Sequence, residues 1–325
     1  MDKRLLHTPE GVRDIYGDEL QNKLRLELKI LEVLHSHLYE DINTPTFEFF
    51  DVFSSNIGTI PSNELYKFFD KDGNTLVLRP DFTPAICRCV AKYYMEEENP
   101  LKFCYLGNTF INTSDYQGRL KETTQLGAEL INDPGASADA EIIQIVIESL
   151  KTAGLSEFQI TIGNVEYFKG LCGEYHIDQD NEMMLREFIS NKNYFGAKAL
   201  LDELGISGQC RTSVLDLFDM FGPVDKIKSA LNSVNNNRSA DALKRLVDIC
   251  DLLGEKGLDK YISFDLGVLS KYHYYTGIVF SAYTYGSGDA IVKGGRYDNL
   301  LSEFGKEAPA IGFAIVIDRL LNLLK

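Results

Sequence analysis

The sequence lacks the patterns that mark a cysteine-based metal or redox centre. Its six cysteines include no C-x-x-C pair, and Cys87 and Cys89 lie two residues apart in a segment of helical character, where they point in different directions. The five histidines, with His35 and His37 in the first predicted helix, show no zinc-site spacing with other ligands. We therefore expect buried, reduced thiols in a cytoplasmic protein, with no metal site and no cofactor.

Long apolar runs and an excess of basic residues are also missing. No segment approaches the roughly 18 consecutive apolar residues of a membrane-spanning helix, and the first residues contain no apolar stretch typical of a secretory signal. Asp and Glu number 48 against 33 Lys and Arg, which gives a net charge of −15. Free-standing nucleic-acid binders usually carry a basic surface, so this balance argues against that class. The missing apolar segments predict a chain that is neither secreted nor bound to a membrane.

The length of the chain bounds its domain organisation. A chain of 325 residues exceeds the usual size of one domain, and 44% hydrophobic with 25% charged residues is ordinary for a globular protein with a sizeable core. No internal repeat or low-complexity tract is visible. We expect either two domains or one large domain with an insertion.

Residues 101–131 predict a long β-hairpin, around which the other elements are arranged. Apolar and polar residues alternate at both ends of this stretch, whereas residues 112–121 between them are polar. Upstream, a helix is expected over about 18–38, followed by a strand over 41–48 with Pro45 inside it, which suits a sheet edge. The leucines at helical spacing that define the helix are Leu20, Leu24, Leu28, Leu31 and Leu34.

A change of pattern separates the middle of the chain from both ends. Leucine and alanine at helical spacing, broken at positions such as Gly205, predict several short helices between residues 166 and 260. Strand patterns return after that segment. We predict a core domain of residues 1–165 and 261–325, with residues 166–260 as a helical insertion subdomain.

Three polar clusters stand in apolar surroundings. Gln125 and Glu129 share one face of the hairpin's return strand, because side chains alternate between the two faces of a strand. The other two clusters are RPDFT at 79–83 and YHYYTG at 272–277. Polar residues such as Gln125 and Glu129 line either a cleft or a solvated face, and the two further clusters favour a cleft.

The same stretches belong to an ordered set of motifs that resembles a known family. These motifs are HTPEG at 7–11, Pro45, LRPDFTPA, QLGAEL, YYTG, GGRYD and GFAIVIDRL. They occur in the order and spacing of the class II aminoacyl-tRNA synthetase catalytic core, and resemble histidyl-tRNA synthetase most specifically. The resemblance covers nearly the whole chain. It implies an α+β fold, an antiparallel sheet flanked by helices, with a dimer interface at the segment that contains Pro45.

Two departures from the synthetase pattern concern charge. The synthetase hairpin carries an arginine that grips the ATP α-phosphate, and Ile111 stands at that position here. A second catalytic arginine of the synthetase matches Ser270, and the adjacent Lys271 points the other way on a strand. Losing one preorganised charge stabiliser costs about 10² to 10³ in rate, so two independent losses cost roughly 10⁴ to 10⁶. Arg119 and Arg319 remain as candidate anion-binding residues.

A third departure is the expected absence of an anticodon-binding domain after Lys325. Together with Asp81 and Phe82 in LRPDFTPA, these features resemble the synthetase-like regulatory subunits of ATP phosphoribosyltransferase. The resemblance implies a non-catalytic subunit needed for the first step of histidine biosynthesis and for its feedback response. Its implied partner is a short-form ATP phosphoribosyltransferase catalytic subunit, joined to a homodimer of this chain in a hetero-octamer, with no tRNA bound.

The resemblance also implies a binding site for L-histidine. Asp81 and Thr83 match residues that hold the α-ammonium group, with Gln125 nearby, and Glu129 and Tyr275 match residues that bind the imidazole. The alternative is that these side chains are inherited packing residues with no ligand.

Other motif residues favour structural roles. Arg79 and Arg296 are interpreted mainly as arginines that bond backbone carbonyls, and Gly294–Gly295 as a tight turn. Three functions stay open on the sequence: a regulatory subunit, a synthetase-like enzyme or fragment that activates an amino acid, and a purely structural dimer scaffold.

Overall fold

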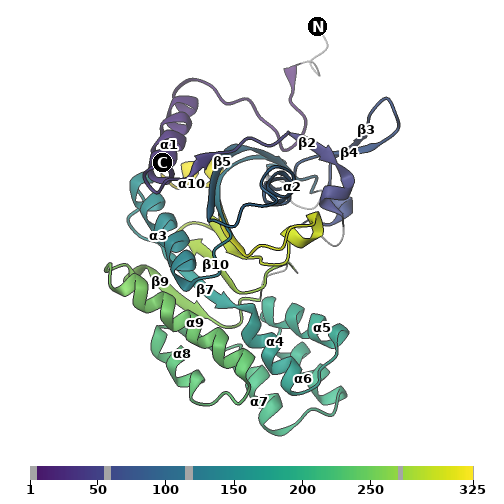
Figure 1. The fold of residues 1–325 in the computed structure, drawn as a ribbon, viewed down its shortest axis with the longest axis vertical. Helices are drawn as coiled ribbons and strands as arrows, with labels where there is room; N and C mark the ends of the chain where they lie inside the picture. The colour runs from purple at the N-terminus through teal and green to yellow at the C-terminus, as the bar shows by residue number, and fades with distance from the viewer. Residues whose placement is uncertain (1–5, 55–59, 114–119, 270–273, 325) are drawn as a thin grey trace.

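The computed structural model describes residues 6–54, 60–113, 120–269 and 274–324. The strands described form a large sheet in the order β1-β5-β6-β12-β11-β10-β7-β9-β8 (Figure 1). In chain order they are β1 Glu40–Asp41, β5 Leu101–Phe110, β6 Glu122–Ile131, β7 Gln159–Asn164, β8 Phe221–Gly222, β9 Ile262–Asp265, β10 Ile278–Tyr283, β11 Val292–Arg296 and β12 Ala310–Val316. Most neighbours are antiparallel, whereas β1 with β5 and β7 with β9 are parallel. The predicted α+β fold is confirmed, with a mixed rather than a wholly antiparallel sheet.

The predicted hairpin forms the second and third strands of this sheet, next to the short edge strand β1. Strands β5 and β6 pair without interruption from Leu101 opposite Ile131 to Phe110 opposite Glu122. Strand β12 then pairs with the other edge of β6, so β6 is hydrogen-bonded on both sides. Residues 114–119 of the hairpin tip lie outside the described residues. The return strand that carries Gln125 and Glu129 is therefore held by a neighbouring strand on each side.

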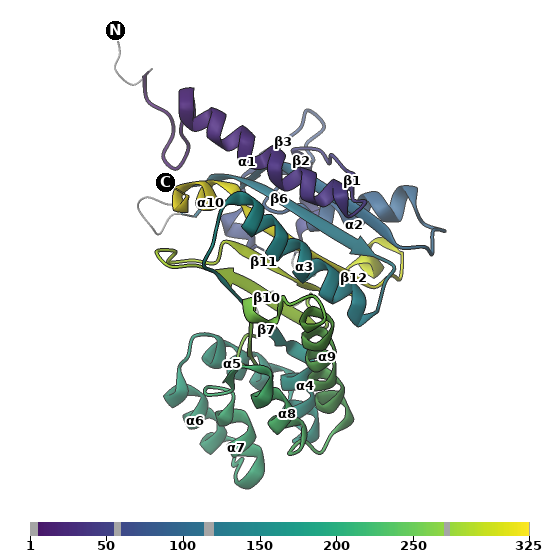
Figure 2. The same cartoon turned by 90° about the vertical axis from the view of Figure 1, so that its left-hand side faces the viewer.

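Helices cover both faces of the sheet. Helices α1 Gly17–Ser36 and α3 Ala136–Ala153 lie along one face (Figure 2), and α2 Thr83–Tyr93 lies within the concave side of the curved sheet (Figure 1). Helix α10 Ile317–Leu323 follows β12 directly and contacts α1. Within the described ranges, no helix combines the length and the apolar character needed to cross a lipid bilayer.

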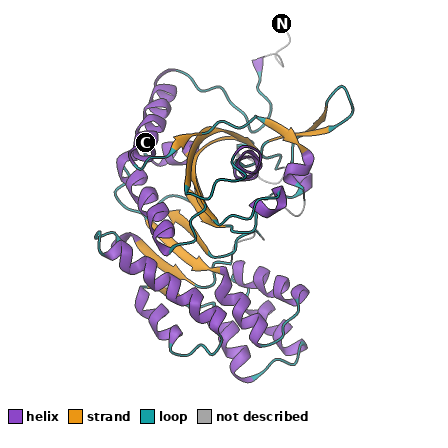
Figure 3. Ribbon diagram, viewed as in Figure 1, coloured by secondary structure: helices purple, strands orange, loops and turns teal. Residues whose placement is uncertain are grey.

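The structure corrects two details of the amino-terminal segment. The strand predicted over 41–48 is interrupted: β1 ends at Asp41, β2 starts at Phe47, and Pro45 lies between them because it has no N–H for a ladder. Strand β2 belongs instead to a second sheet in the order β2-β4-β3. That sheet consists of β2 Phe47–Phe49, β3 Lys67–Phe69 and β4 Thr75–Leu78. Figure 3 shows this small sheet beside the main one.

The buried face of α1 also differs from the predicted leucine stripe. Leu24 and Leu28 are 49% and 58% exposed, whereas Leu26, Ile30 and Leu34 are buried. The helix packs on α3 and α10, and this tertiary contact selects a face rotated from the one that the leucine spacing indicates. The periodicity located the helix but not its packing face.

The segment after β7 is mainly helical, in keeping with the short helices predicted there. Its helices are α4 Val165–Glu174, α5 Gln179–Ser190, α6 Tyr194–Glu203, α7 Gly208–Asp216, α8 Val224–Leu231 and α9 Asn237–Gly254. Side-chain caps fix several starts; Asn164, Asp178, Asn193 and Asn236 each accept a backbone N–H of the first turn. Short 3₁₀ turns occur at Phe50–Phe53, Ser62–Glu64, Asp259–Tyr261 and Leu301–Phe304. The division into a core and an insertion subdomain stays a prediction.

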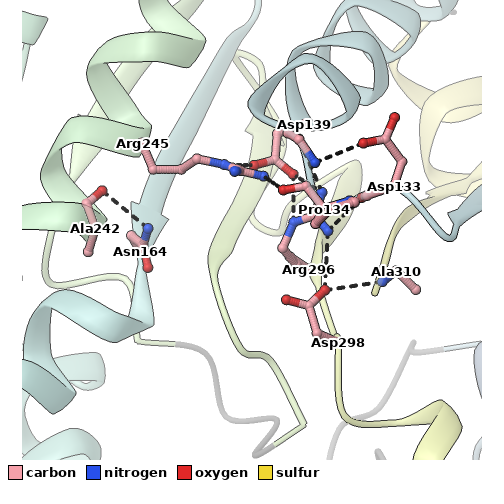
Figure 4. A network of polar contacts seen from close by, with 10 residues as sticks. Asp133, Pro134, Asp139, Asn164, Ala242, Arg245, Arg296, Asp298 and Ala310 are labelled. Atoms are coloured by element: carbon pink, nitrogen blue, oxygen red, sulfur yellow. Dashed lines mark hydrogen bonds and ion pairs between the residues drawn. The ribbon is translucent and has the colours of Figure 1, made fainter. Parts of the chain in front are cut away.

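A buried carboxylate connects this helical segment to the main sheet (Figure 4). Asp139 of α3 is fully buried and accepts hydrogen bonds from Arg296 Nε at 2.8 Å and Nη2 at 2.6 Å. Arg245 of α9 donates to the other carboxylate oxygen at 2.6 Å and to the Pro134 carbonyl at 2.7 Å. Arg296 also bonds Asp298 at 3.1 Å. Three elements distant in sequence are therefore joined by one side chain.

We predict that Asp139→Asn lowers the free energy of unfolding by about 3–5 kcal/mol, because it leaves two guanidinium groups without their buried counter-charge. Urea denaturation of the purified chain measures this value. Asp241→Asn is the matched control on the exposed face of α9, and we expect its effect to stay within about 0.5 kcal/mol. Equal effects of the two substitutions would contradict a structural role for Asp139.

Candidate functional site

A cavity of about 430 Å³ opens on the face of the main sheet that carries α2. Its volume is within the range of small-molecule sites, roughly 300–1,000 Å³. The cavity brings together the five residues predicted to bind histidine, which come from the start of α2, from β6 and from the segment before β10. These lining residues are Asp81, Thr83, Gln125, Glu129 and Tyr275.

Glu129 is the most buried acid of the cavity, with 1% exposure. Thr83 donates its hydroxyl to Glu129 Oε1 at 2.8 Å, and the Tyr297 hydroxyl donates to Oε2. Burial raises the pKa of Glu129 from its ordinary value of 4.5 to about 8, and the nearby charge of Asp81 adds to this shift, while the two hydroxyl bonds oppose it. The site therefore contains a carboxyl group that is largely protonated near neutral pH.

Sequence reasoning missed the role of Tyr297. It lies directly after β11, in a motif for which the sequence predicts only structural roles. The tight turn predicted at Gly294–Gly295 is wrong: both glycines belong to β11 and pair with β10 and β12, where Phe280 and the Gly312 carbonyl leave no room for a side chain at Gly294. Glu129 and Tyr297 are separated by 168 residues, and the only sequence signal for their contact is that both belong to motifs of the same family.

A glycine opposite Glu129 makes room for its carboxyl group. Gly312 of β12 is the register partner of Glu129 on β6. A methyl group added at Gly312 would overlap Glu129 Oε2, so a side chain there would expel the carboxyl group from its position. The φ of Gly312 is not in the left-handed region, so backbone conformation does not require a glycine here. The close approach of the Glu129 carboxyl group does.

Gln125 carries a buried acceptor that the described part of the chain leaves unsatisfied. Its Oε1 atom is buried and accepts no hydrogen bond from any described residue, although Gln125 lines the cavity. A buried polar atom without a partner costs about 1–3 kcal/mol. A ligand with an N–H or ammonium group beside Gln125 would remove that cost.

Asp81 and Tyr275 complete the ligand-facing set. Asp81 Oδ1 accepts the backbone N–H of Phe82 at 2.7 Å, which fixes the carboxylate at the start of α2. Tyr275 is 8% exposed and packs against Tyr274, with ring centroids 4.5 Å apart and ring planes tilted by 38°. Both side chains are therefore held by neighbouring groups before any ligand arrives.

Of the two anion-binding candidates, the structure describes Arg319 and not Arg119. Arg319 lines the cavity but forms an ion pair with Asp289 at 3.2 Å and donates to the Ala290 carbonyl. Ile111 also lines the cavity and presents an apolar side chain there. Arg119, Ser270 and Lys271 lie outside the described residues.

The structural interpretation of the two motif arginines is confirmed. Arg79 donates to the carbonyls of Asn108 and Thr44, each at 2.8 Å, and its guanidinium lies 4.1 Å from the Phe82 ring centroid. Arg296 bonds Asp139 and the Asp133 carbonyl, as described above. Neither arginine is available to bind a phosphate.

Comparisons with known proteins agree with these motifs. A family model described as histidyl-tRNA synthetase matches residues 11–320. The chain is 41% identical to an ATP phosphoribosyltransferase regulatory subunit of Ruminiclostridium cellulolyticum, over 100% of this chain and 78% of that protein. A protein of the same name from Acetivibrio thermocellus is 40% identical, over 98% of this chain and 76% of its own length.

A solved structure supports the same relationship. The crystal structure of an ATP phosphoribosyltransferase regulatory subunit/histidyl-tRNA synthetase from Bacillus halodurans is similar, with a TM-score of 0.92 and 35% identity, over 99% of this chain and 84% of that one. The chain spans 76–84% of the length of these three relatives. The resemblance predicted from the sequence is confirmed.

The raised pKa of Glu129 predicts a pH-dependent stability. Between about pH 4.5 and 8, Glu129 binds more protons in the folded chain than in the unfolded chain. The contribution of this group alone to the free energy of unfolding therefore falls as pH rises through this window, by up to about 1.4 kcal/mol per pH unit. Glu129→Gln should remove this contribution, and urea denaturation across the window measures it. With the exposed Glu98→Gln as control, identical pH profiles for the two variants would contradict the assignment.

Proposed function

The chain belongs to the family of ATP phosphoribosyltransferase regulatory subunits, which share a synthetase-like core, and we propose that its cavity binds L-histidine without activating it. The observation that carries the proposal is the unsatisfied Gln125 Oε1 atom in a cavity that is also lined by three carboxyl groups and four phenols. A ligand that supplies both an ammonium group and ring N–H groups fits this set of partners.

The ammonium group is assigned to the end of the cavity at the start of α2. Asp81 supplies a carboxylate, and Gln125 supplies the acceptor that lacks a donor. Thr83 gives its hydroxyl proton to Glu129, and the lone pairs of a hydroxyl oxygen can still accept from an ammonium group. These acceptors together match a group that only donates.

The imidazole is assigned to Glu129 and Tyr275. Imidazole has one donor and one acceptor nitrogen, and a carboxyl–phenol pair can serve both. Because Glu129 is largely protonated in the free protein, its state can adapt: it donates as an acid or accepts as a carboxylate. A ligand cation beside it would favour the carboxylate and lower its pKa.

The absence of catalysis is proposed from the charge pattern of the cavity. Ile111 stands where the synthetase hairpin carries its phosphate-gripping arginine, and Arg319 is held by Asp289. A phosphate placed beside Ile111 would meet an apolar side chain instead of a preorganised cation. We therefore assign the amino-acid half of a synthetase site to this chain and not its adenylation chemistry.

The proposed partner is a short-form ATP phosphoribosyltransferase catalytic chain. The names of the relatives imply such a partner for them, and the sequence contains neither a P-loop nor a phosphoribosyl-binding loop of its own. Histidine that binds one state of an assembly more tightly than another shifts the equilibrium between the two states by the difference between its binding free energies. The partner's activity changes with that equilibrium. We propose a homodimer of this chain within a hetero-octamer, with no tRNA as partner.

Calorimetry tests the ligand. We expect L-histidine to release heat on binding and L-leucine to give none, since leucine would leave the polar groups of the cavity unpaired. Glu129→Gln should weaken histidine binding by about 10- to 100-fold, as expected for loss of a charged hydrogen-bond partner. Glu122→Gln, on the same strand but outside the cavity lining, should bind like the unmodified chain. Equal heats for both amino acids would disprove the proposal.

Histidine-dependent exchange of pyrophosphate into ATP tests the proposed lack of catalysis. We expect no exchange above that of an Arg319→Ala variant, because the phosphate-facing position holds Ile111. If the unmodified chain catalyses exchange and the Arg319→Ala variant does not, the synthetase-like alternative is favoured.

Size-exclusion chromatography with light scattering tests the partner. Mixed with a purified short-form ATP phosphoribosyltransferase, this chain should elute earlier than either chain alone, with a mass that corresponds to equal, even numbers of both. Separate elution at micromolar concentrations would instead support the purely structural dimer scaffold.

A further inference from the structure

A cluster of three potential metal ligands lies on the opposite side of the main sheet from the cavity. His35 belongs to the last turn of α1, Asp41 ends β1, and Cys104 lies on β5. Their ligand atoms all lie within 4.8 Å of one another. His35 Nε2 is 3.2 Å from Asp41 Oδ1, and Cys104 Sγ is 3.5 Å from the same oxygen.

We propose that His35, Asp41 and Cys104 bind a zinc ion. In tetrahedral zinc sites, bonds of about 2.0–2.3 Å place neighbouring ligand atoms roughly 3.3–3.6 Å apart. Both distances to Asp41 Oδ1 are close to this spacing, so only a small movement of His35 toward Cys104 completes three corners of a tetrahedron. A fourth position is left for water.

The backbone holds two of the three ligands in place. Asp41 and Cys104 are register partners in the parallel pair of β1 and β5, and the N–H of Ile42 donates to the Cys104 carbonyl at 2.8 Å. Only the histidine is carried by a different layer of the fold. The spacing between the carboxylate and the thiol is therefore set by the sheet and not by mobile side chains alone.

The ligand types and their exposure favour zinc over the hard cations. One thiol, one imidazole and one carboxylate suit zinc, whereas calcium and magnesium require oxygen ligands. His35 and Asp41 are exposed, and Cys104 is buried beneath them. An ion can therefore reach Cys104 from the solvent side, past His35 and Asp41. The bound ion would join the end of α1 to the edge of the sheet.

No pattern along the chain indicates this site. His35 and Asp41 are six residues apart, and Cys104 follows 63 residues later, so no metal-site spacing is visible along the chain. The ligands meet because β1 pairs with β5, the first strand of the hairpin.

Calorimetric titration of the tag-free full chain with zinc chloride tests the proposal. We expect one equivalent to bind, and His35→Ala or Cys104→Ser to weaken binding by at least about 10- to 100-fold, since loss of a group that merely orients a ligand already costs that much. His37→Ala is the matched control, because His37 lies two residues further on and bonds Glu148 at 2.7 Å instead. It should bind zinc as the unmodified chain does.

Cobalt(II) in place of zinc identifies the cysteine directly. The cobalt complex should show thiolate-to-metal charge-transfer absorption that Cys104→Ser removes and Cys89→Ser, at a half-exposed cysteine, does not. Substitution of the exposed His35 keeps the test decisive if Cys104→Ser does not fold. Absence of zinc binding, binding unchanged by His35→Ala, or a cobalt complex without the thiolate band would each overturn the proposal.

Discussion

The buried carboxylate of Asp139 determines how the helical segment, the main sheet and the cavity fit together. It accepts hydrogen bonds from Arg245 of α9 and from Arg296 of β11, so a displacement of either element breaks charged bonds in a buried environment. The carbonyl of Arg296 accepts the N–H of Thr276, next to Tyr275, and Tyr297 follows Arg296 directly. The side chains that surround Glu129 are therefore positioned by a network centred outside the cavity, which gives the helical segment a physical connection to the site.

The cavity itself combines close packing with unsatisfied polar groups. Gly312 leaves room for the carboxyl group of Glu129, and burial there raises its pKa to about 8. Gln125 contributes an acceptor without a described donor. Ile111 contributes an apolar side chain to the same cavity, and Arg319 is held in an ion pair with Asp289. This combination suits a chain that senses an amino acid and leaves the chemistry to a partner.

Local patterns predicted local structure well and long-range contacts poorly. The hairpin at 101–131 was predictable because alternation and a polar tip are properties of neighbouring residues, and the family motifs located Glu129 and Thr83 in one cavity. The packing face of α1 depends on α3 and α10, and no spacing of leucines encodes those contacts. The contact of Tyr297 with Glu129 was not predicted for the same reason, since the two residues are 168 positions apart in the sequence.

The most direct test of the account is the rate of phosphoribosyl transfer by a short-form catalytic chain, measured with and without this chain over a range of L-histidine concentrations. We expect that adding this chain changes the rate. With the Glu129→Gln subunit, the histidine response should move to about 10- to 100-fold higher concentration, whereas Glu122→Gln should leave it unchanged. A rate and a histidine response that are the same with and without this chain would contradict the account.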